Sequence, residues 1–314
     1  GRADQLARLI AHQLGATPVL TGASAGLDLP GIDILGVPFG WQRGEGDWTG
    51  VSAVVARGEP VQVIQEVGST LWQNHLPKGH SFQFALSEDT ATALPLDKQG
   101  NSNSNLIPQA KIWISATQRQ VSLESNLPDV QWHPRVLWVG IGCERGTSKE
   151  LIETAIGQVC QSNHLAEDAI AGIATIDLKA DEEGLVQLCG DRNWPLRIFP
   201  ADILRSVNVP NPSAVVDKEV GTPSVSEAAA LVAANGEVEA QSLAPLLVGK
   251  QIIRDENQPG AVTVAIAQAE REYTGRTGQL LLIGTGPGQL DQITPAAKIA
   301  IAQADVVIGY SLYI

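Results

Sequence analysis

Apolar and polar positions alternate between strand-like and helix-like segments over residues 135–270. Residues 135–143, RVLWVGIGC, form a nearly continuous apolar run that is typical of a buried strand. Residues 149–160, KELIETAIGQVC, repeat apolar side chains at helical spacing behind Ser148, a good capping residue. The same reasoning predicts strands at 170–176, 195–199, 243–254 and 261–268, and helices at 181–189, 201–207 and 222–234. Strands that alternate with helices in this way predict a three-layer α/β domain.

The segment before it has a less regular pattern and predicts a smaller α/β middle domain. A glycine-rich loop leads into a helix that carries Val51, Val54 and Val55. Strands are expected at 60–68 and 110–116, and loops at 97–105 and 118–134.

Both ends of the chain resemble pieces of other α/β domains. Residues 2–14 predict a helix and residues 17–24 a short strand, a unit too small to fold alone. Residues 280–295, LLLIGTGPGQLDQITP, predict a strand, a glycine-rich turn and the start of a helix. Because the chain starts inside a helical pattern and contains no methionine, either it is a fragment of a longer protein or modified residues are absent from its sequence. The expected divisions are 1–24, 25–133, 134–270, a linker at 271–279, and 280–314.

Composition narrows the class of function. The formal net charge of −13 argues against nucleic acid as a partner and allows an anionic ligand only in a locally basic pocket. The three cysteines form no CxxC pair, which favours reduced thiols and a cytoplasmic protein. No spacing of metal ligands, no signal peptide and no membrane-spanning run is evident, so no protein metal site and no membrane partner are expected.

The strongest candidate site is the turn VGIGCERGTSKE, residues 139–150. It ends a strand and opens a helix, where free backbone N–H groups favour a carboxylate or phosphate. Ligands in open α/β sheets bind at the carboxyl ends of strands, which is where this turn falls. The alternative is a purely structural role, in which its glycines only make a tight turn and Thr147 or Ser148 caps the helix. The candidate binding residues are Gly142, Cys143, Arg145, Gly146, Thr147 and Ser148.

Two further turns are candidates with weaker support. In TIDLKADEE, residues 175–183, Asp177 and Lys179 could act as a general base and an oxyanion-binding cation. The acids at 181–183 fit an ordinary first helical turn. In DKEVGTPSVSE, residues 217–227, the candidates Glu219, Gly221 and Thr222 precede a helix whose Ser224 and Glu227 fit a capping box. A routine helix entry explains that turn equally well.

These three blocks together resemble the cobalt-precorrin 5A hydrolases of anaerobic cobalamin synthesis. VGIGCERGTS, AGIATIDLKADEEGL and VPNPSAVVDKEVGTPSVSEAAAL have the order and spacing of that family. LGVPFGWQRGEGDWTGVSAVVARGEPVQVIQEVGSTLWQ is similar to its middle domain, and residues 1–24 to the end of its N-terminal domain. The resemblance therefore covers nearly all of residues 1–270.

Residues 280–314 resemble a different family, the tetrapyrrole methyltransferases, and most closely precorrin-3B methyltransferase. That family uses S-adenosylmethionine, and its first loop has the form GxGPG. Gly284, Gly286, Pro287 and Gly288 match this form here. The resemblance implies a fusion of a hydrolase with the start of a methyltransferase, in which S-adenosylmethionine serves only the complete methyltransferase.

The resemblance implies a reaction that opens a lactone on a cobalt-corrinoid and releases acetaldehyde. From residue chemistry we assign Glu144 or Asp177 as the base, and Arg145, Lys179 and the backbone of residues 142–148 as oxyanion and carboxylate binders. Cys143 lacks a neighbouring histidine to activate it as a nucleophile. The hydrolase part needs no tightly bound cofactor, because cobalt arrives inside the substrate. A homodimer is a possible assembly. The alternatives are a non-catalytic module that hands corrinoids to the methyltransferase, and a nucleotide-binding α/β protein.

Overall fold

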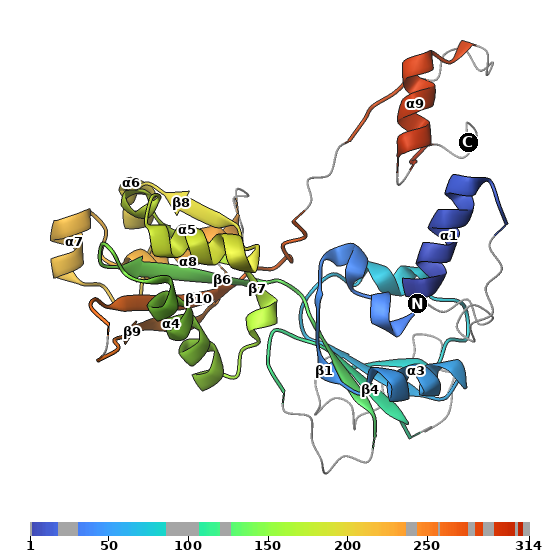
Figure 1. Ribbon diagram of the computed structural model, residues 1–314, viewed down its shortest axis with the longest axis horizontal. Coiled ribbons are helices and arrows are strands. Elements are labelled where there is room, and N and C mark those ends of the chain that lie inside the picture. Colours follow the sequence, from blue (N-terminus) through green and yellow to red (C-terminus); the bar gives the residue numbers. More distant parts are fainter. Residues whose placement is uncertain are drawn as a thin grey trace. The chain divides into compact units, whose positions relative to one another are not determined.

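A computed structural model of the chain describes most of its residues (Figure 1). The described residues are 2–17, 31–85, 107–119, 127–236, 244–256, 258–275, 280–284, 292–304 and 307–309. The chain divides into two compact units, residues 1–274 and residues 275–314. The first unit contains two five-stranded sheets.

The second sheet carries the candidate site and mixes parallel and antiparallel strands. Its strand order is β8-β7-β6-β10-β9. Strands β6, β7 and β8 are parallel, and β10 is antiparallel to both β6 and β9. The bounds are β6 Leu137–Cys143, β7 Ile170–Ile176, β8 Leu196–Phe199, β9 Leu246–Ile253 and β10 Val262–Gln268. All seven residues of β7 are buried, as expected for a parallel strand covered on both faces.

Helices cover both faces of this sheet and create two separate apolar cores. One core contains side chains of α4 (Lys149–Ser162) and α5 (Glu183–Arg192), and the other contains side chains of α6 (Ala201–Arg205) and α8 (Val225–Asn235). The apolar face expected on α4 is buried. Helix α8 is rich in alanine, which lets it lie very close to β6. A Cβ placed on Gly140 would be only 1.8 Å from the carbonyl oxygen of Ser226. The predicted three-layer α/β domain is confirmed.

The first sheet forms the smaller α/β domain. Its strand order is β1-β5-β4-β2-β3, with β1 antiparallel to β5 and the other pairs parallel. The bounds are β1 Gln42–Gly46, β2 Val61–Gln65, β3 Phe82–Ala85, β4 Ala110–Ile114 and β5 Asp129–His133. Helix α3 (Trp48–Ala56) packs Val51, Val54 and Val55 into the core of this sheet, as predicted.

Short helices complete the described structure. Helix α1 spans Arg2–Leu14, and α7 spans Ala214–Val220. The 3-10 helices are η1 Ile32–Ile34, η2 Val37–Phe39, η3 Leu71–His75, η4 Glu167–Ala169 and η5 Asp177–Lys179. In the second unit, α9 (Pro295–Gln303) begins with Thr294, whose hydroxyl accepts the N–H of Ala297.

Several local predictions were wrong. Residues 129–133 form β5 and not a loop, because neighbouring strands on both sides satisfy their backbone groups. In the segment 139–150, which was treated as one turn, Gly140 and Gly142 lie inside β6, within the strand predicted at 135–143. Residues 280–283 do not form a strand, and their side chains are exposed. An isolated strand leaves its N–H and C=O groups without a neighbour, and no strand pairs with this segment among the described residues. The predicted strand at 17–24 and the loop at 97–105 lie outside the described residues.

Candidate functional site

A cavity of about 550 Å³ lies where β6 and β7 end and α8 begins. Five of the residues singled out in the sequence line it, namely Gly142, Cys143, Glu144, Arg145 and Lys179. The remaining lining residues are Ile176, Leu178, Ser213, Val216, Val220, Ser224, Val225, Lys250, Ile252, Ala261 and Thr263. This is the place where open α/β sheets hold ligands, since turns after neighbouring parallel strands meet there.

The turn after β6 is held by its own polar groups. Gly146 has φ of +75°, a conformation that favours glycine, and the Thr147 hydroxyl donates to the carbonyl of Glu144 at 2.8 Å. The Ser148 hydroxyl accepts the N–H of Leu151 at 3.1 Å and caps α4. Gly146, Thr147 and Ser148 do not line the cavity. These three residues fix the turn so that residues 142–145, which precede them, face the cavity.

Arg145 and Lys179 both reach the cavity, and both contact carboxylates. Arg145 donates to Asp181 at 2.6 Å and to the carbonyl of Leu178 at 2.7 Å. Lys179 Nζ lies 3.5 Å from a carboxylate oxygen of Glu182. The pair of Arg145 with Asp181 is exposed, so it adds little to stability but fixes the direction of the guanidinium.

Glu182 is a site residue that the sequence did not single out. Its side chain is buried, and its carboxylate accepts the N–H of Gly146 at 2.7 Å. It precedes α5 but does not cap that helix. A glutamate in this position looks like an ordinary first-turn acid, and its sequence holds no signal of the contact to a residue 36 positions away. Glu182 joins the turn after β6 to the turn after β7.

The two candidate bases have different surroundings. Glu144 lines the cavity, and its carboxylate has no hydrogen bond or ion pair among the described residues. Asp177, which is exposed like Glu144, does not line the cavity and accepts the N–H of Leu178 at 2.8 Å. The structure therefore brings Glu144 together with Arg145 and Lys179, but leaves Asp177 outside.

Cys143 lines the cavity as a protonated thiol. Burial raises its pKa to about 11, although the nearby cation of Lys179 acts in the opposite direction. Because the thiolate is the nucleophilic form, almost none is present at neutral pH. Cys143 is therefore suited to packing against a ligand and not to attacking one.

The third candidate turn contributes neighbours of the predicted residues. Glu219 lies in α7, a helix that was not predicted from the sequence, and Gly221 ends this helix with φ of +80°. Thr222 is fully buried, and neither Gly221 nor Thr222 lines the cavity. Val216 and Val220 of α7 form part of its apolar wall instead.

A buried carboxylate also supports the far side of the cavity. Glu227 is fully buried and accepts three hydrogen bonds, from Asn211 Nδ2 at 2.7 Å, from the N–H of Asn211 at 3.2 Å and from the N–H of Lys250 at 2.9 Å. Ser224 is the N-cap residue of α8, but its side chain accepts no capping hydrogen bond, so the predicted capping box is not formed. Glu227 is used for the Asn211 and Lys250 contacts instead.

Burial acts to raise the pKa of Glu227, but the hydrogen bonds from the Asn211 side chain and the two backbone N–H groups outweigh it. The pKa of Glu227 therefore lies below its ordinary value, and the carboxylate stays charged at neutral pH. The signal that could have identified Glu227 and Lys250 is a single charge inside an otherwise apolar helix or strand.

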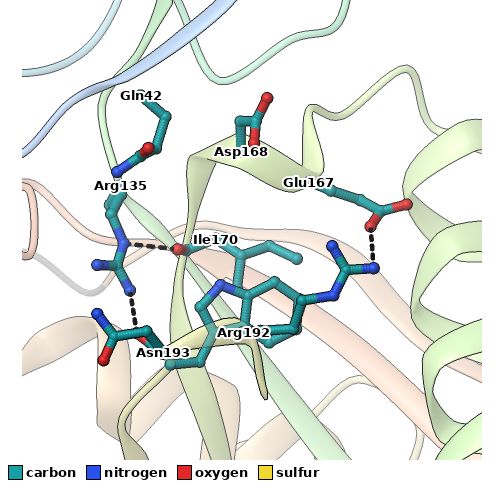
Figure 2. A pocket seen from close by; sticks show the side chains of 8 residues that line it. Gln42, Arg135, Glu167, Asp168, Ile170, Arg192 and Asn193 are labelled. Atoms are coloured by element: carbon teal, nitrogen blue, oxygen red, sulfur yellow. Dashed lines mark hydrogen bonds and ion pairs between the residues drawn. The ribbon is translucent and has the colours of Figure 1, made fainter. Parts of the chain in front are cut away.

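A second cavity, of about 250 Å³, contains none of the predicted residues (Figure 2). Arg135 donates to the carbonyl of Ile170 at 3.0 Å and to that of Asn193 at 3.4 Å. Arg192 forms an ion pair with Glu167 at 3.9 Å. Figure 2 shows both guanidinium groups directed at these protein partners, so they hold the ends of strands and helices together.

Within the described parts of the chain, no three His, Cys, Asp or Glu side chains gather in a way that could hold a metal ion. No helix in those parts is long and apolar enough to cross a bilayer.

Two family models match adjoining parts of the chain. Residues 30–134 match the model described as cobalamin biosynthesis central region, and residues 137–267 match the model described as cobalamin synthesis G C-terminus. Together they account for both sheets of the first unit.

The chain is also similar to individual proteins. A cobalt-precorrin-5A hydrolase of Priestia megaterium is 30% identical over 234 residues, which are 74% of this chain and 60% of that protein. A cobalt-precorrin-5A hydrolase of Salmonella typhimurium is 26% identical over 249 residues, 77% of this chain and 65% of that protein. The chain thus spans less than two thirds of the length of these curated relatives. The crystal structure of cobalamin biosynthesis protein chiG from Agrobacterium tumefaciens is 30% identical, with 43% of this chain and 98% of that chain covered and a TM-score of 0.31.

Proposed function

We propose that this chain, which belongs to the cobalamin synthesis G family, hydrolyses the lactone of cobalt-precorrin 5A and releases acetaldehyde. The observation that carries the proposal is the cavity after β6 and β7, where Glu144 lies beside Arg145 and Lys179. The names of the two hydrolase relatives support the same reaction.

The lining of the cavity suits a polycarboxylate macrocycle. Arg145, Lys179 and Lys250 supply positive charge in a chain whose formal net charge is −13. The apolar side chains of Ile176, Val216 and other lining residues offer a surface to the flat face of a ring. A locally basic, partly apolar cavity attracts an anionic ring and repels few of its groups.

Glu144 is the general base in this proposal. Its carboxylate takes a proton from water as the water oxygen attacks the lactone carbonyl carbon, and it returns this proton to the ring oxygen when the C–O bond breaks. The freed alcohol then loses its O–H proton as the carbon–carbon bond to the macrocycle breaks. Acetaldehyde leaves, and the macrocycle takes up the bonding electron pair and a proton. Arg145 and Lys179 donate hydrogen bonds to the oxyanion that forms at the carbonyl. Asp177, the other base assigned from the sequence, lies outside the cavity. Cobalt belongs to the substrate and takes no part in these steps.

Acetaldehyde release from cobalt-precorrin 5A tests this proposal. E144Q should lower kcat by about 10²–10⁴-fold, the usual contribution of a general base, with little change in substrate affinity. D177N is the matched control, because it removes an exposed carboxylate nearby, and should keep nearly full activity. Full activity in E144Q would remove Glu144 from the mechanism. Tight corrinoid binding by the wild-type chain without any acetaldehyde would favour the handover module instead.

We further propose that residues 280–314 open a precorrin-3B methyltransferase in a longer polypeptide. The GxGPG sequence from Gly284 to Gly288 supports this proposal. Gly284 is described without a strand before it, and Gly286, Pro287 and Gly288 lie outside the described residues. No step of the proposed chemistry involves S-adenosylmethionine. A cytoplasmic location and a homodimer are parts of the same proposal.

A further inference from the structure

The three cationic side chains that line the main cavity differ in their partners. Arg145 pairs with Asp181 and Lys179 with Glu182. Lys250 has no carboxylate partner within the described part of the chain, and its ammonium group donates to the carbonyl of Asn211 at 2.7 Å. A lysine ammonium has three donors, so two remain for a ligand. Lys250 can therefore bind an added carboxylate without first giving up an ion pair.

The position of Lys250 is fixed by its surroundings. Its backbone N–H is held by the buried carboxylate of Glu227, which also holds Asn211 by both its backbone and its side chain. The backbone carbonyl of Asn211 in turn accepts a hydrogen bond from the ammonium group of Lys250. Gly249 lies so close to this group that an added Cβ would be 3.2 Å from Asn211 Nδ2. These hydrogen bonds hold the ammonium group of Lys250 in place before a ligand binds, so the group is preorganised for binding.

Lys250 also lies on the opposite side of the cavity from the other two cations. Lys179 follows β7 and Arg145 follows β6, whereas Lys250 belongs to β9. The strand order β7-β6-β10-β9 separates β7 from β9 by three strand spacings, on the order of 14 Å. A ligand that contacts both sides must be large and must carry anionic groups on opposite edges.

We propose that Lys250 binds a peripheral carboxylate of the corrinoid on the edge opposite to the one held by Arg145 and Lys179. Lys250 is then a specificity residue, because it favours ligands whose ring is wide enough to reach it and carries a negative charge at that edge. This inference rests on the proposed function, because it takes the corrinoid as the ligand of the cavity.

Calorimetric titration of the 314-residue chain tests the assignment. The probe is cobyrinic acid, a cobalt corrinoid with free peripheral carboxylates, and its methyl ester serves as the uncharged comparison. K250M should bind the acid about ten- to hundredfold more weakly than wild type, as expected for a lost hydrogen bond between charged groups. The ester should bind wild type and K250M equally. K78M is the matched control, since Lys78 is an exposed lysine outside the cavity, and it should leave the affinity unchanged.

The outcomes distinguish a failure of the Lys250 assignment from a failure of the proposed function. If wild type binds the acid and K250M binds it as tightly, the Lys250 assignment is overturned while the proposed function stands. If wild type does not bind the acid, the proposed function fails and this inference fails with it. Thermal unfolding verifies that each variant is folded. If K250M is unfolded, K250Q provides the same comparison, because its amide can still donate to the carbonyl of Asn211.

Discussion

Replacement of Glu227 by glutamine should destabilise the second sheet and its helices. The carboxylate is fully buried, and its two oxygens accept three N–H donors, two from Asn211 and one from Lys250. The E227Q side chain keeps the shape of glutamate but loses the charge, so the remaining bonds weaken. The NH2 group of the new side chain is a donor, and it must lie opposite an N–H whose hydrogen bond the carboxylate oxygen accepted in wild type.

The magnitude follows from the number and kind of bonds. A hydrogen bond to a charged group contributes about 1.5–3 kcal/mol, and one between neutral groups about 0.5–1.5 kcal/mol. Removing a buried charge also relieves its desolvation, which offsets part of the loss. We expect E227Q to lower the free energy of unfolding by about 2–3 kcal/mol at neutral pH.

The effect should depend on pH in a defined direction. The folded-state pKa of Glu227 lies below its unfolded value, since the hydrogen bonds from Asn211 and Lys250 outweigh burial. Such a group stabilises the fold above the unfolded pKa of about 4.3, and this stabilisation is lost as pH falls through the folded pKa. The difference between wild type and E227Q should therefore be largest near neutral pH and should narrow in acid.

Urea unfolding followed by far-UV circular dichroism, at pH 7 and below pH 4, measures this difference. E183Q is the matched control, because Glu183 is exposed and, among the described residues, accepts a side-chain hydrogen bond from Gln187 alone, in its own helix. It should change the free energy of unfolding by less than about 0.5 kcal/mol. An E227Q variant as stable as wild type at pH 7, or a difference that widens in acid, would refute the reasoning.

Two further predictions concern the close packing of α8 and the end of the chain. G140A should lower the free energy of unfolding by about 3 kcal/mol or more, because its Cβ would overlap the Ser226 carbonyl. In the same urea experiment G190A should be neutral or slightly stabilising, because a Cβ at Gly190 meets nothing within 4 Å. Titration of S-adenosylmethionine into the 314-residue chain should release no heat of binding, because the described residues 280–284, which lead into the GxGPG sequence, form no strand. Micromolar affinity would contradict this.

Local periodicity was sufficient to predict most of the second sheet. Strands such as β7 and helices such as α4 are long, apolar and bounded by clear signals, so local pattern and tertiary packing agree. Strand β5 was missed because it lies next to prolines and contains polar residues. Its pairing with β1 and β4 depends on residues far away in the sequence. Strand β1, which contains two glycines, was missed for the same reason.

The candidate site was predicted only in part. The rule that ligands bind after parallel strands located Glu144, Arg145 and Lys179, which the structure places around one cavity. It could not identify Glu182 or Lys250. Glu182 contacts a residue 36 positions away and looks like an ordinary first-turn acid. The single charge of Lys250 in an apolar strand marks the residue, but not its contact with a residue 39 positions away. Asp177 follows the same rule as Lys179, yet the 3-10 helix that begins at Asp177 leaves its side chain outside the cavity.

The cavity after β6 and β7 is the proposed site of hydrolysis, and Glu144 is its proposed base. The most direct measurement is the amount of acetaldehyde formed in a single turnover, with the chain in excess over cobalt-precorrin 5A. We predict one equivalent of acetaldehyde per substrate for wild type, and formation at least about a hundredfold slower for E144Q when both bind the corrinoid equally. Equal rates for the two proteins, or no acetaldehyde from a wild-type chain that has bound its substrate, would contradict the account.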